Sequence, residues 1–494
     1  MMRKMFWSVM CITLVLFSAC GTASPGPAGG GSQRVVAISA ASEIALALME
    51  DGSLWAWGNG RIGWDGAPLY GVGDGTAENR DRPVKIMEDV AFALAGHTHS
   101  LAITTDGTLW AWGANWWGQI GDGTTTNRLY PVPVLSDVVY AAMPQLAPRT
   151  GAWGGQGRSY AIRADGSLWA WGQSGGFESQ VPLGDGEFTD RHEPVRILEN
   201  AVHVVPTPDG GFALTADGTL WSWHGSVIFL TEGGDWNEAG DWEEIEGRLY
   251  PQPVMGNVAS VSACGSFAIT AGGELWSLPW FGDPSHVPSH VMDNVVYAAS
   301  LSGSNFAITA GGELWAWGRN LLPSRWSPGP LLGDGTTTNR GAPVRIMGDV
   351  AHIAVMGNSA YAITNDGGLW EWGPGTGCPL RNFPGFYQQE GQMWEYADDA
   401  IPRGRRWLLE DDGGTGLRLS PVRIMENVIS LAPTYFSLDH GWVRGERAFA
   451  LTSGGELWAW GENDAFGLGW GLLGDGTSER RLSPVRIIPA EGGM

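Results

Sequence analysis

Eight copies of a short tryptophan-rich pattern constrain this sequence more than any other feature. The pattern reads Leu-Trp-Ala-Trp at residues 109–112. It recurs, with small changes, at residues 54–57, 168–171, 220–223, 275–278, 314–317, 369–372 and 457–460. Most successive copies lie 52 to 59 residues apart. Self-similarity at a fixed period of this size indicates a repeat architecture.

The second copy shows the repeating unit most clearly. We expect strands at residues 90–95, 100–104 and 109–112, with Asp106-Gly107 as a tight hairpin turn because glycine tolerates positive φ. A Gly-Asp-Gly-Thr loop follows at 121–124, and a last strand contains Pro131 and Val134. Proline cannot donate a ladder hydrogen bond, so this last strand should be the outer edge of its sheet.

Both faces of the expected sheet are apolar. Leu109 and Ala111 face one side, whereas Trp110 and Trp112 face the other. A sheet of this kind must be covered on both faces, and the unit contains no helical segment to cover it. Neighbouring units must therefore cover each other, which predicts an all-β fold, a β-propeller of four-stranded blades. The first and last units are as apolar as the others, which favours a single closed ring over an open stack with polar caps.

Three stretches of the second unit carry a family resemblance: Asp106 to Gly113, Gly118 to Thr124, and Pro131-Val132. Together they resemble the regulator-of-chromosome-condensation repeat in its bacterial form. The loop recurs at 333–340 and, more loosely, at 73–80, 184–191 and 474–480. The resemblance implies a propeller that usually has seven blades, but the eight signatures favour eight. It also implies regulation of a small GTPase by nucleotide exchange, as in some eukaryotic relatives, or inhibition of β-lactamases, as in another.

The N-terminal residues resemble a bacterial lipoprotein export signal. Arg3 and Lys4 precede an apolar run that is too short to span a bilayer comfortably, and Cys20 follows in a lipobox-like context. We expect a signal peptide at 1–19, lipid on Cys20, a Gly/Pro/Ser tether at 20–34 and the propeller at 35–489. The chain would then be exported and attached to the outer face of a bacterial membrane. The alternative is an ordinary cleaved signal in which Cys20 occurs by chance.

The charge of the chain argues against nucleic acid as a partner. The formal charge of −23 becomes −25 without residues 1–19, which hold Arg3 and Lys4 and no acid. Affinity for nucleic acid comes largely from lysine and arginine neutralising phosphates, and Lys4 and Lys85 are the only lysines. We also expect no cofactor and a monomeric protein.

The Gly-Asp-Gly-Thr loops raise the possibility of calcium sites. Calcium requires six to eight converging oxygens, whereas each loop has one regularly placed carboxylate, at Asp122, Asp185, Asp334 or Asp475. An arginine follows each of them after six residues: Arg128, Arg191, Arg340 and Arg481. We therefore expect each aspartate to cap a turn and pair with its arginine. The histidines match no recognised metal motif, so we expect no metal site.

Two long insertions are the best candidates for a binding surface, and we place them at 225–250 and 374–417. Aromatic and arginine side chains are the usual anchors of binding surfaces. The first insertion is acidic and has no strand alternation. The candidate residues are Trp236, Trp242, Glu243 and Glu244 in the first insertion, and Trp394, Tyr396, Arg403, Arg405, Arg406 and Trp407 in the second. The alternative is that these tryptophans fold back and cap the rim of the ring.

The variable segments should share one side of the ring. All the insertions and replacements fall between the expected third and fourth strands, so they should emerge on one rim. We find no catalytic motif, and adjacent acids such as Asp398-Asp399 and Asp411-Asp412 are more typical of solvated surface. The sequence thus favours a non-catalytic scaffold whose rim loops bind a protein or glycan. Two alternatives stay open: a GTPase regulator, and a propeller hydrolase or lyase acting on polysaccharide with carboxylates near the axis.

Overall fold

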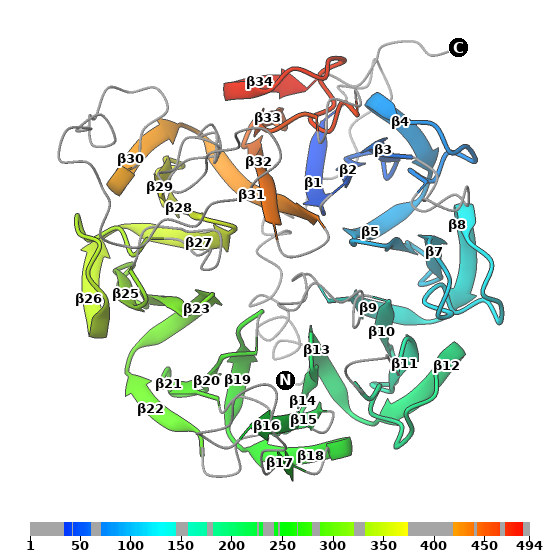
Figure 1. Cartoon of the computed structure of the whole chain (residues 1–494). Helices are drawn as coiled ribbons and strands as arrows, with labels where there is room; N and C mark the ends of the chain where they lie inside the picture. The colour runs from blue at the N-terminus through cyan, green and yellow to red at the C-terminus, as the bar shows by residue number, and fades with distance from the viewer. Residues whose placement is uncertain are drawn as a thin grey trace, which may run out of the picture.

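The structure is a computed structural model. It describes residues 34–41, 43–60, 71–144, 157–174, 181–224, 227–230, 242–245, 248–263, 265–278, 287–320, 331–373, 418–438, 442–464 and 470–487. Every regular element in these residues is a β-strand. Eight four-stranded antiparallel sheets, the blades, surround a central axis, as Figure 1 shows. The predicted all-β propeller is confirmed, with eight blades rather than seven.

Each blade is built from four strands that follow one another along the chain. Blades 1 and 2 comprise β1 (Val35–Ala40), β2 (Ile44–Met49), β3 (Leu54–Gly58) and β4 (Arg80–Met87), then β5 (Val90–Ala95), β6 (His99–Thr104), β7 (Leu109–Gly113) and β8 (Arg128–Leu135). Blades 3 and 4 comprise β9 (Val138–Ala142), β10 (Arg158–Arg163), β11 (Leu168–Gly172) and β12 (Arg191–Leu198), then β13 (Ala201–Thr207), β14 (Gly210–Thr215), β15 (Leu220–His224) and β18 (Arg248–Met255).

The other four blades follow the same order. Blades 5 and 6 comprise β19 (Val258–Val261), β20 (Phe267–Thr270), β21 (Leu275–Ser277) and β22 (Ser289–Met292), then β23 (Val295–Leu301), β24 (Ser304–Thr309), β25 (Leu314–Gly318) and β26 (Arg340–Met347). Blades 7 and 8 comprise β27 (Val350–Met356), β28 (Ser359–Thr364), β29 (Leu369–Gly373) and β30 (Arg418–Met425), then β31 (Val428–Leu438), β32 (Trp442–Thr452), β33 (Leu457–Gly461) and β34 (Arg481–Ile487). The first strand of each blade lies nearest the axis and the fourth lies outermost (Figure 1).

The apolar core is divided among the contacts between neighbouring blades. Leu54 and Ala56 of blade 1 pack with Trp112 of blade 2, whereas Trp57 of blade 1 packs with Phe449 and Leu457 of blade 8. Each of the eight junctions holds a buried cluster that draws on both of its blades. The prediction that units cover each other's apolar faces is confirmed.

The ring closes without exchanging a strand between its first and last blades. The Gly52 carbonyl, in the hairpin between the second and third strands of blade 1, accepts a hydrogen bond from Val90 N at the start of blade 2, at 2.9 Å. An equivalent bond joins each of the remaining pairs of neighbouring blades. At the closing junction the Gly455 carbonyl accepts from Val35 N at 3.1 Å, and Arg34 donates to the Ser453 carbonyl at 2.6 Å. The seam therefore uses the same backbone bond as the seven other junctions.

The antiparallel order gives the ring two different rims. We call the rim that carries the hairpins between second and third strands, and the links from one blade to the next, the regular rim. The opposite rim carries the connections between first and second strands and between third and fourth strands, and we call it the variable rim. The insertions at 225–247 and 374–417 leave blades 4 and 7 on the variable rim. The single-rim prediction is confirmed.

Two details of the insertions differ from the prediction. The fourth strand of blade 4 begins at Arg248, so the first insertion ends at residue 247 and not at 250. It also contains a two-stranded sheet, β16 (Val227–Leu230) paired with β17 (Trp242–Ile245), although the sequence there lacks strand alternation. Variation also arises between first and second strands. Residues 143–157 link β9 to β10 in blade 3, and the first two strands of blade 8 extend to 11 residues each.

Candidate functional site

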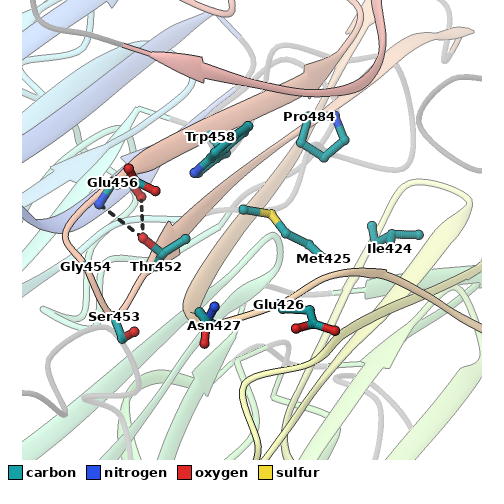
Figure 2. Close-up of a pocket in the computed structure, with 10 residues that line it drawn as sticks. All are labelled: Ile424, Met425, Glu426, Asn427, Thr452, Ser453, Gly454, Glu456, Trp458 and Pro484. Carbon is teal, nitrogen blue, oxygen red and sulfur yellow. Dashed lines mark hydrogen bonds between the residues drawn. The ribbon is translucent and has the colours of Figure 1, made fainter.

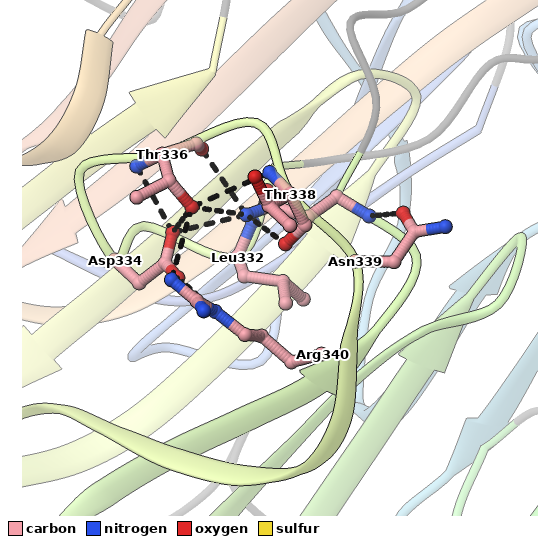
Figure 3. A network of polar contacts seen from close by, with 7 residues as sticks. Leu332, Asp334, Thr336, Thr338, Asn339 and Arg340 are labelled. Atoms are coloured by element: carbon pink, nitrogen blue, oxygen red, sulfur yellow. Dashed lines mark hydrogen bonds and ion pairs between the residues drawn. The ribbon is translucent and has the colours of Figure 1, made fainter.

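A buried asparagine organises each of the best-formed Gly-Asp-Gly-Thr loops. In blade 6 the Asn320 amide nitrogen donates to Asp334 Oδ1 at 2.9 Å and to the carbonyls of Thr336 and Thr338, at 3.1 and 3.2 Å (Figure 3). Its own Oδ1 accepts from Leu332 N at 2.9 Å. Asn115 in blade 2 and Asn463 in blade 8 make the same set of bonds. The sequence prediction missed these asparagines, although each follows shortly after its Leu-Trp-Ala-Trp-Gly strand.

The aspartate that recurs in these loops forms an ion pair. Asp122 Oδ2 accepts from Arg128 Nε at 2.6 Å, and Oδ1 accepts from the hydroxyl of Thr124 at 2.7 Å. Burial opposes ionisation of Asp122, but the bonds from Thr124 and Arg128 hold its pKa below the usual value. The three other predicted pairs form with the same 2.6 Å contact, as does Asp74 with Arg80. The turn-and-arginine interpretation is confirmed.

These loops also attach each blade to the next one. The second glycine of a loop donates its N–H to the outermost strand of the following blade, as Gly123 does to the His192 carbonyl at 2.9 Å. The first glycine lies against the second tryptophan of that blade. A Cβ built on Gly121 would lie 2.6 Å from Trp171 Nε1, so a larger residue does not fit there without movement. The loops are therefore structural contacts between blades.

The sequences that join the third and fourth strands of blades 4, 5 and 7 lack the Gly-Asp-Gly-Thr motif. At the position of the second tryptophan, blade 5 has the smaller Leu278, which faces the blade 4 side that has no loop. Trp317 of blade 6, which faces blade 5, is 9% exposed, whereas Trp57, Trp112 and Trp171 are fully buried behind their loops. Blades 4 to 6 are thus joined by fewer peripheral contacts in the described part of the chain.

Most of the predicted binding residues lie outside the described residues. These are Trp236 in the first insertion, and Trp394, Tyr396, Arg403, Arg405, Arg406 and Trp407 in the second. Trp242, Glu243 and Glu244 belong to strand β17. Cys20 and the paired acids Asp398-Asp399 and Asp411-Asp412 also lie outside. Their roles remain predictions.

The base of the second insertion contains an unusual ion pair. Glu371 occupies the third position of its Leu-Trp-x-Trp strand, where every other copy has alanine or serine. Its carboxylate pairs with Arg418, the first residue of the strand that receives the chain after the insertion. Gly373 and Arg418 are also opposite each other in the sheet. The two ends of the insertion are therefore held side by side at the variable rim. The charged residue within an otherwise apolar pattern was the signal that the sequence prediction did not use.

A second buried carboxylate links blade 8 to the same place. Glu446 accepts from Asn358 N at 2.6 Å and from the Ser359 hydroxyl at 2.8 Å, both in blade 7. Burial is the main cause that raises the pKa of Glu446 to about 7, and the charge of Glu371 adds to it. Glu371 and Glu446 thus fix the two blades beneath the longest insertion.

Polar side chains at the same height join other blades. Arg158 of blade 3 donates to the carbonyls of Thr207 and Pro208 in blade 4, at 3.0 and 2.8 Å, and Arg447 of blade 8 donates to the Ala41 carbonyl of blade 1, at 2.7 Å. His99 of blade 2 bonds to Ser159 of blade 3 at 2.7 Å, and burial lowers the pKa of His99 to about 3, so its ring is neutral. These bonds hold the variable rim as a rigid base for its loops.

One cavity of about 680 Å³ lies on the regular rim between blades 7 and 8 (Figure 2). Trp458, Met425 and Pro484 supply apolar surface, and Glu426 and Glu456 are its carboxylates. Glu456 pairs with Arg486 at 3.2 Å and Glu426 with Arg423 at 3.7 Å, so both charges are already compensated. The cavity does not contain the charged residues that the sequence singled out, and we do not assign the function to it.

The residues nearest the axis bear on the polysaccharide hypothesis. The eight innermost strands carry no aspartate, glutamate, lysine or arginine within their bounds. A pair of carboxylates for glycoside cleavage therefore has no place on these strands. Among the described residues, no group of three or more His, Cys, Asp or Glu side chains is arranged to hold a metal ion. Within the same residues, no helix is long and apolar enough to cross a bilayer.

Comparison with known families identifies a described repeat in this chain. Residues 106–143 and 90–115 each match the family described as "Regulator of chromosome condensation (RCC1) repeat". Residues 90–143 therefore carry the RCC1 repeat. Together the matched residues cover all four strands of blade 2, their Gly-Asp-Gly loop and the first strand of blade 3, which is the stretch where the repeat is most regular.

Two curated relatives share RCC1-type repeats. The ultraviolet-B receptor UVR8 of Arabidopsis thaliana is 23% identical over 412 residues, which cover 76% of this chain and 88% of that protein. The mitochondrial RCC1 domain-containing protein RUG3 of the same plant is 29% identical over 254 residues. That match covers 50% of this chain and about half, 53%, of RUG3.

Solved structures with a similar chain trace include two of yeast RCC1. Yeast RCC1 (Prp20) bound to Kap60 is 17% identical with a TM-score of 0.49, covering 94% of this chain and 90% of that one. Prp20p from Saccharomyces cerevisiae, described with its binding to Gsp1p and histones, is 17% identical with a TM-score of 0.48, covering 92% and 87%.

Proposed function

We propose that this protein is a non-catalytic binding scaffold that presents its variable rim to a protein partner. One observation carries the proposal. The segments that distinguish one repeat from another all leave the ring on the variable rim, whereas the regular rim repeats the same turns around the ring. Repeat proteins usually place binding on the face where their units differ.

The chemistry of the rim supports a protein partner over a reaction. The loop carboxylates and arginines are occupied by one another, and Glu371 and Glu446 bond within and between blades. The candidate contact residues, Trp394, Tyr396, Arg403 and their neighbours in the second insertion, are the types that dominate protein interfaces. We further propose that lipid on Cys20 holds the protein on the outer face of a bacterial membrane. This location and the acidic surface favour an envelope partner over a cytosolic GTPase.

Partner capture with and without the second insertion tests the proposal. The full-length protein, recovered from its native envelope, is compared with a variant that lacks residues 375–416. Gly373 pairs with Arg418, so the deletion leaves a two-residue hairpin link that the sheet accommodates. We expect the deletion to abolish capture of a partner that the intact protein retains at high salt. A matched control, Thr105→Arg, changes an exposed residue on the regular rim of blade 2 and should keep capture.

Two results would contradict the proposal. Undiminished capture by the folded deletion variant would remove the binding role of that insertion. Turnover of a polysaccharide by the purified protein would instead support the hypothesis of a hydrolase or lyase. For the anchor, Cys20→Ser should release the protein from the membrane fraction, and retention of that variant would exclude lipid on Cys20.

A further inference from the structure

The point where the chain enters the ring has a fixed position. Val35 begins the innermost strand of blade 1 on the regular rim, and its N–H donates to the Gly455 carbonyl in the blade 8 hairpin. Arg34 donates to the Ser453 carbonyl in the same hairpin, at 2.6 Å. Residues before Arg34 therefore leave from the inner margin of the regular rim, the end of the ring opposite the insertions.

The length of the preceding chain limits where Cys20 can reach. Cys20 lies fourteen residues before Arg34, and the intervening sequence is rich in glycine, proline and serine. A flexible chain of that length has a root-mean-square span of roughly 20 Å. Even fully extended it covers at most about 50 Å.

The dimensions of a blade exceed that typical span. Four strands spaced about 4.8 Å apart make a blade roughly 15 Å wide from its inner to its outer strand, before side chains are added. Strands of five to eight residues make it roughly 20 Å tall. A path from the inner margin of the regular rim, around the outer strand and up to the variable rim is therefore at least about 35 Å. A path along the central axis is roughly the blade height of 20 Å, which uses the whole typical span and leaves none to reach a bilayer beyond the variable rim.

We infer that the membrane-bound ring stands with its regular rim toward the lipid surface and its variable rim toward the outside. This orientation rests on the proposed lipid attachment at Cys20. The regular rim is the surface that faces the bilayer, and the partner approaches from the opposite side. The strand ends that bound the two insertions, on blades 4 and 7, then face away from the membrane.

Charge on the regular rim sets how closely it approaches the bilayer. The turns between second and third strands expose Asp51, Asp106, Asp165, Asp217 and Asp366. Anionic headgroups repel these carboxylates within a screening length of about 8 Å at physiological ionic strength. The rim therefore faces the bilayer across a layer of water and is held near it by the tether alone.

Energy transfer from the two rims of one blade to the bilayer tests the orientation. Thr105 on the regular rim and Thr125 on the variable rim are both exposed and both belong to blade 2. Each is replaced by cysteine and labelled with the same donor, in full-length lipidated protein carrying Cys264→Ser and Cys378→Ser. The protein is placed on phosphatidylcholine vesicles that contain an acceptor lipid.

We expect transfer from position 105 to exceed transfer from position 125 by about twofold or more, because the two rims differ in height by roughly 20 Å. Equal transfer, or more transfer from position 125, would overturn the orientation while leaving the lipid anchor intact. No transfer from either position, together with protein recovered free of the vesicles, would overturn the anchor and the orientation together. Lengthening the tether by forty Gly/Ser residues should reduce the difference, as expected if the tether sets it.

Discussion

At Gly121 the absence of a Cβ atom decides whether two blades fit together. The residue has a φ of +84°, and an added Cβ would lie 2.6 Å from the indole nitrogen of Trp171. Trp171 is fully buried and donates to the Gln119 carbonyl at 2.9 Å, so it has little room to move. The packing between blades 2 and 3 therefore depends on a residue that a propensity argument would assign only to a turn.

We predict that Gly121→Ala lowers the free energy of unfolding by about 2–5 kcal/mol, the sum of an unfavourable left-handed backbone and an overpacked core. Gly75→Ala is the matched control. Its φ is +85°, but an added Cβ meets nothing within 4 Å, so its cost should stay near 1 kcal/mol. Urea denaturation of both variants measures the difference. Equal destabilisation by the two substitutions would show that the indole contact does not matter.

Glu446 predicts a dependence of stability on pH. Burial raises its pKa to about 7 from an ordinary value near 4.5, so the folded protein binds this proton more tightly than the unfolded chain does. The stabilisation is complete below pH 4.5 and is lost as the pH rises through 7, at no more than about 1.4 kcal/mol per pH unit for one group. Glu43 contributes in the same direction, because burial also raises its pKa to about 7.

We therefore predict that the wild-type protein loses stability relative to Glu446→Gln as the pH rises from 4.5 to 7. Burial lowers the pKa of His99, His203 and His352, so these groups change stability in the opposite direction, but they do so equally in both proteins. Denaturation midpoints measured across the range provide the test, with the exposed Glu479→Gln as the control that keeps the wild-type slope. A wild-type slope in Glu446→Gln would mean that the proton belongs to other groups.

At the scale of elements, blade 5 is the least supported part of the ring. Its strands are only three or four residues long. Neither its sequence nor that of blade 4 has a Gly-Asp-Gly motif between the third and fourth strands. In the cluster that blade 5 shares with blade 6, Trp317 is 9% exposed, whereas Trp57 and Trp112 are 0% exposed. Fewer buried contacts and shorter ladders should lower the free energy of local opening.

We predict that the amides of Phe267–Thr270 and Leu275–Ser277 exchange with solvent at least about tenfold faster than those of His99–Thr104 and Leu109–Gly113, because local opening there requires less disruption. Hydrogen exchange followed by mass spectrometry resolves the two sets of peptides. Similar protection in blades 2 and 5 would show that the loops add little to blade stability.

The elements differ in how far the sequence determined them in advance. The tryptophan strands were predictable because alternation placed apolar residues on both faces, and Leu109 and Trp112 do pack against opposite neighbours. The pairing of Asp122 with Arg128 was predictable because their six-residue spacing recurs. The contacts of Glu446 and Arg158 were not, because they join residues whose proximity depends on how blades stack around the ring.

The candidate site was predicted less well than the fold. Spacing between repeats showed where extra chain is inserted, and strand order confirmed which rim carries it. The spacing between repeats did not show the hairpin of β16 and β17, since those residues lack alternation and only their pairing defines them. Nor did it indicate that Glu371 and Arg418 hold the ends of the second insertion together.

At the scale of the whole molecule, the ring is one cooperative unit. Each blade covers one face of both neighbours, so no blade has a complete core of its own. We predict that removing blade 8, residues 428–494, exposes the apolar faces of blades 1 and 7 and yields aggregated protein that binds a hydrophobic dye. Light scattering and dye fluorescence measure this. Removing residues 375–416 instead should leave a monomer, and a soluble, dye-free seven-blade product would contradict the argument.

The seam between blades 8 and 1 has a consequence for where the polypeptide has to start. Val35 and Gly455 are joined by the bond that Val90 and Gly52 make within the continuous chain, and no strand crosses from one terminus into the other's blade. The fold therefore does not require the chain to begin at blade 1. Joining the old ends and cutting any other link on the regular rim preserves every blade, and would move the membrane tether to a chosen point on the circumference.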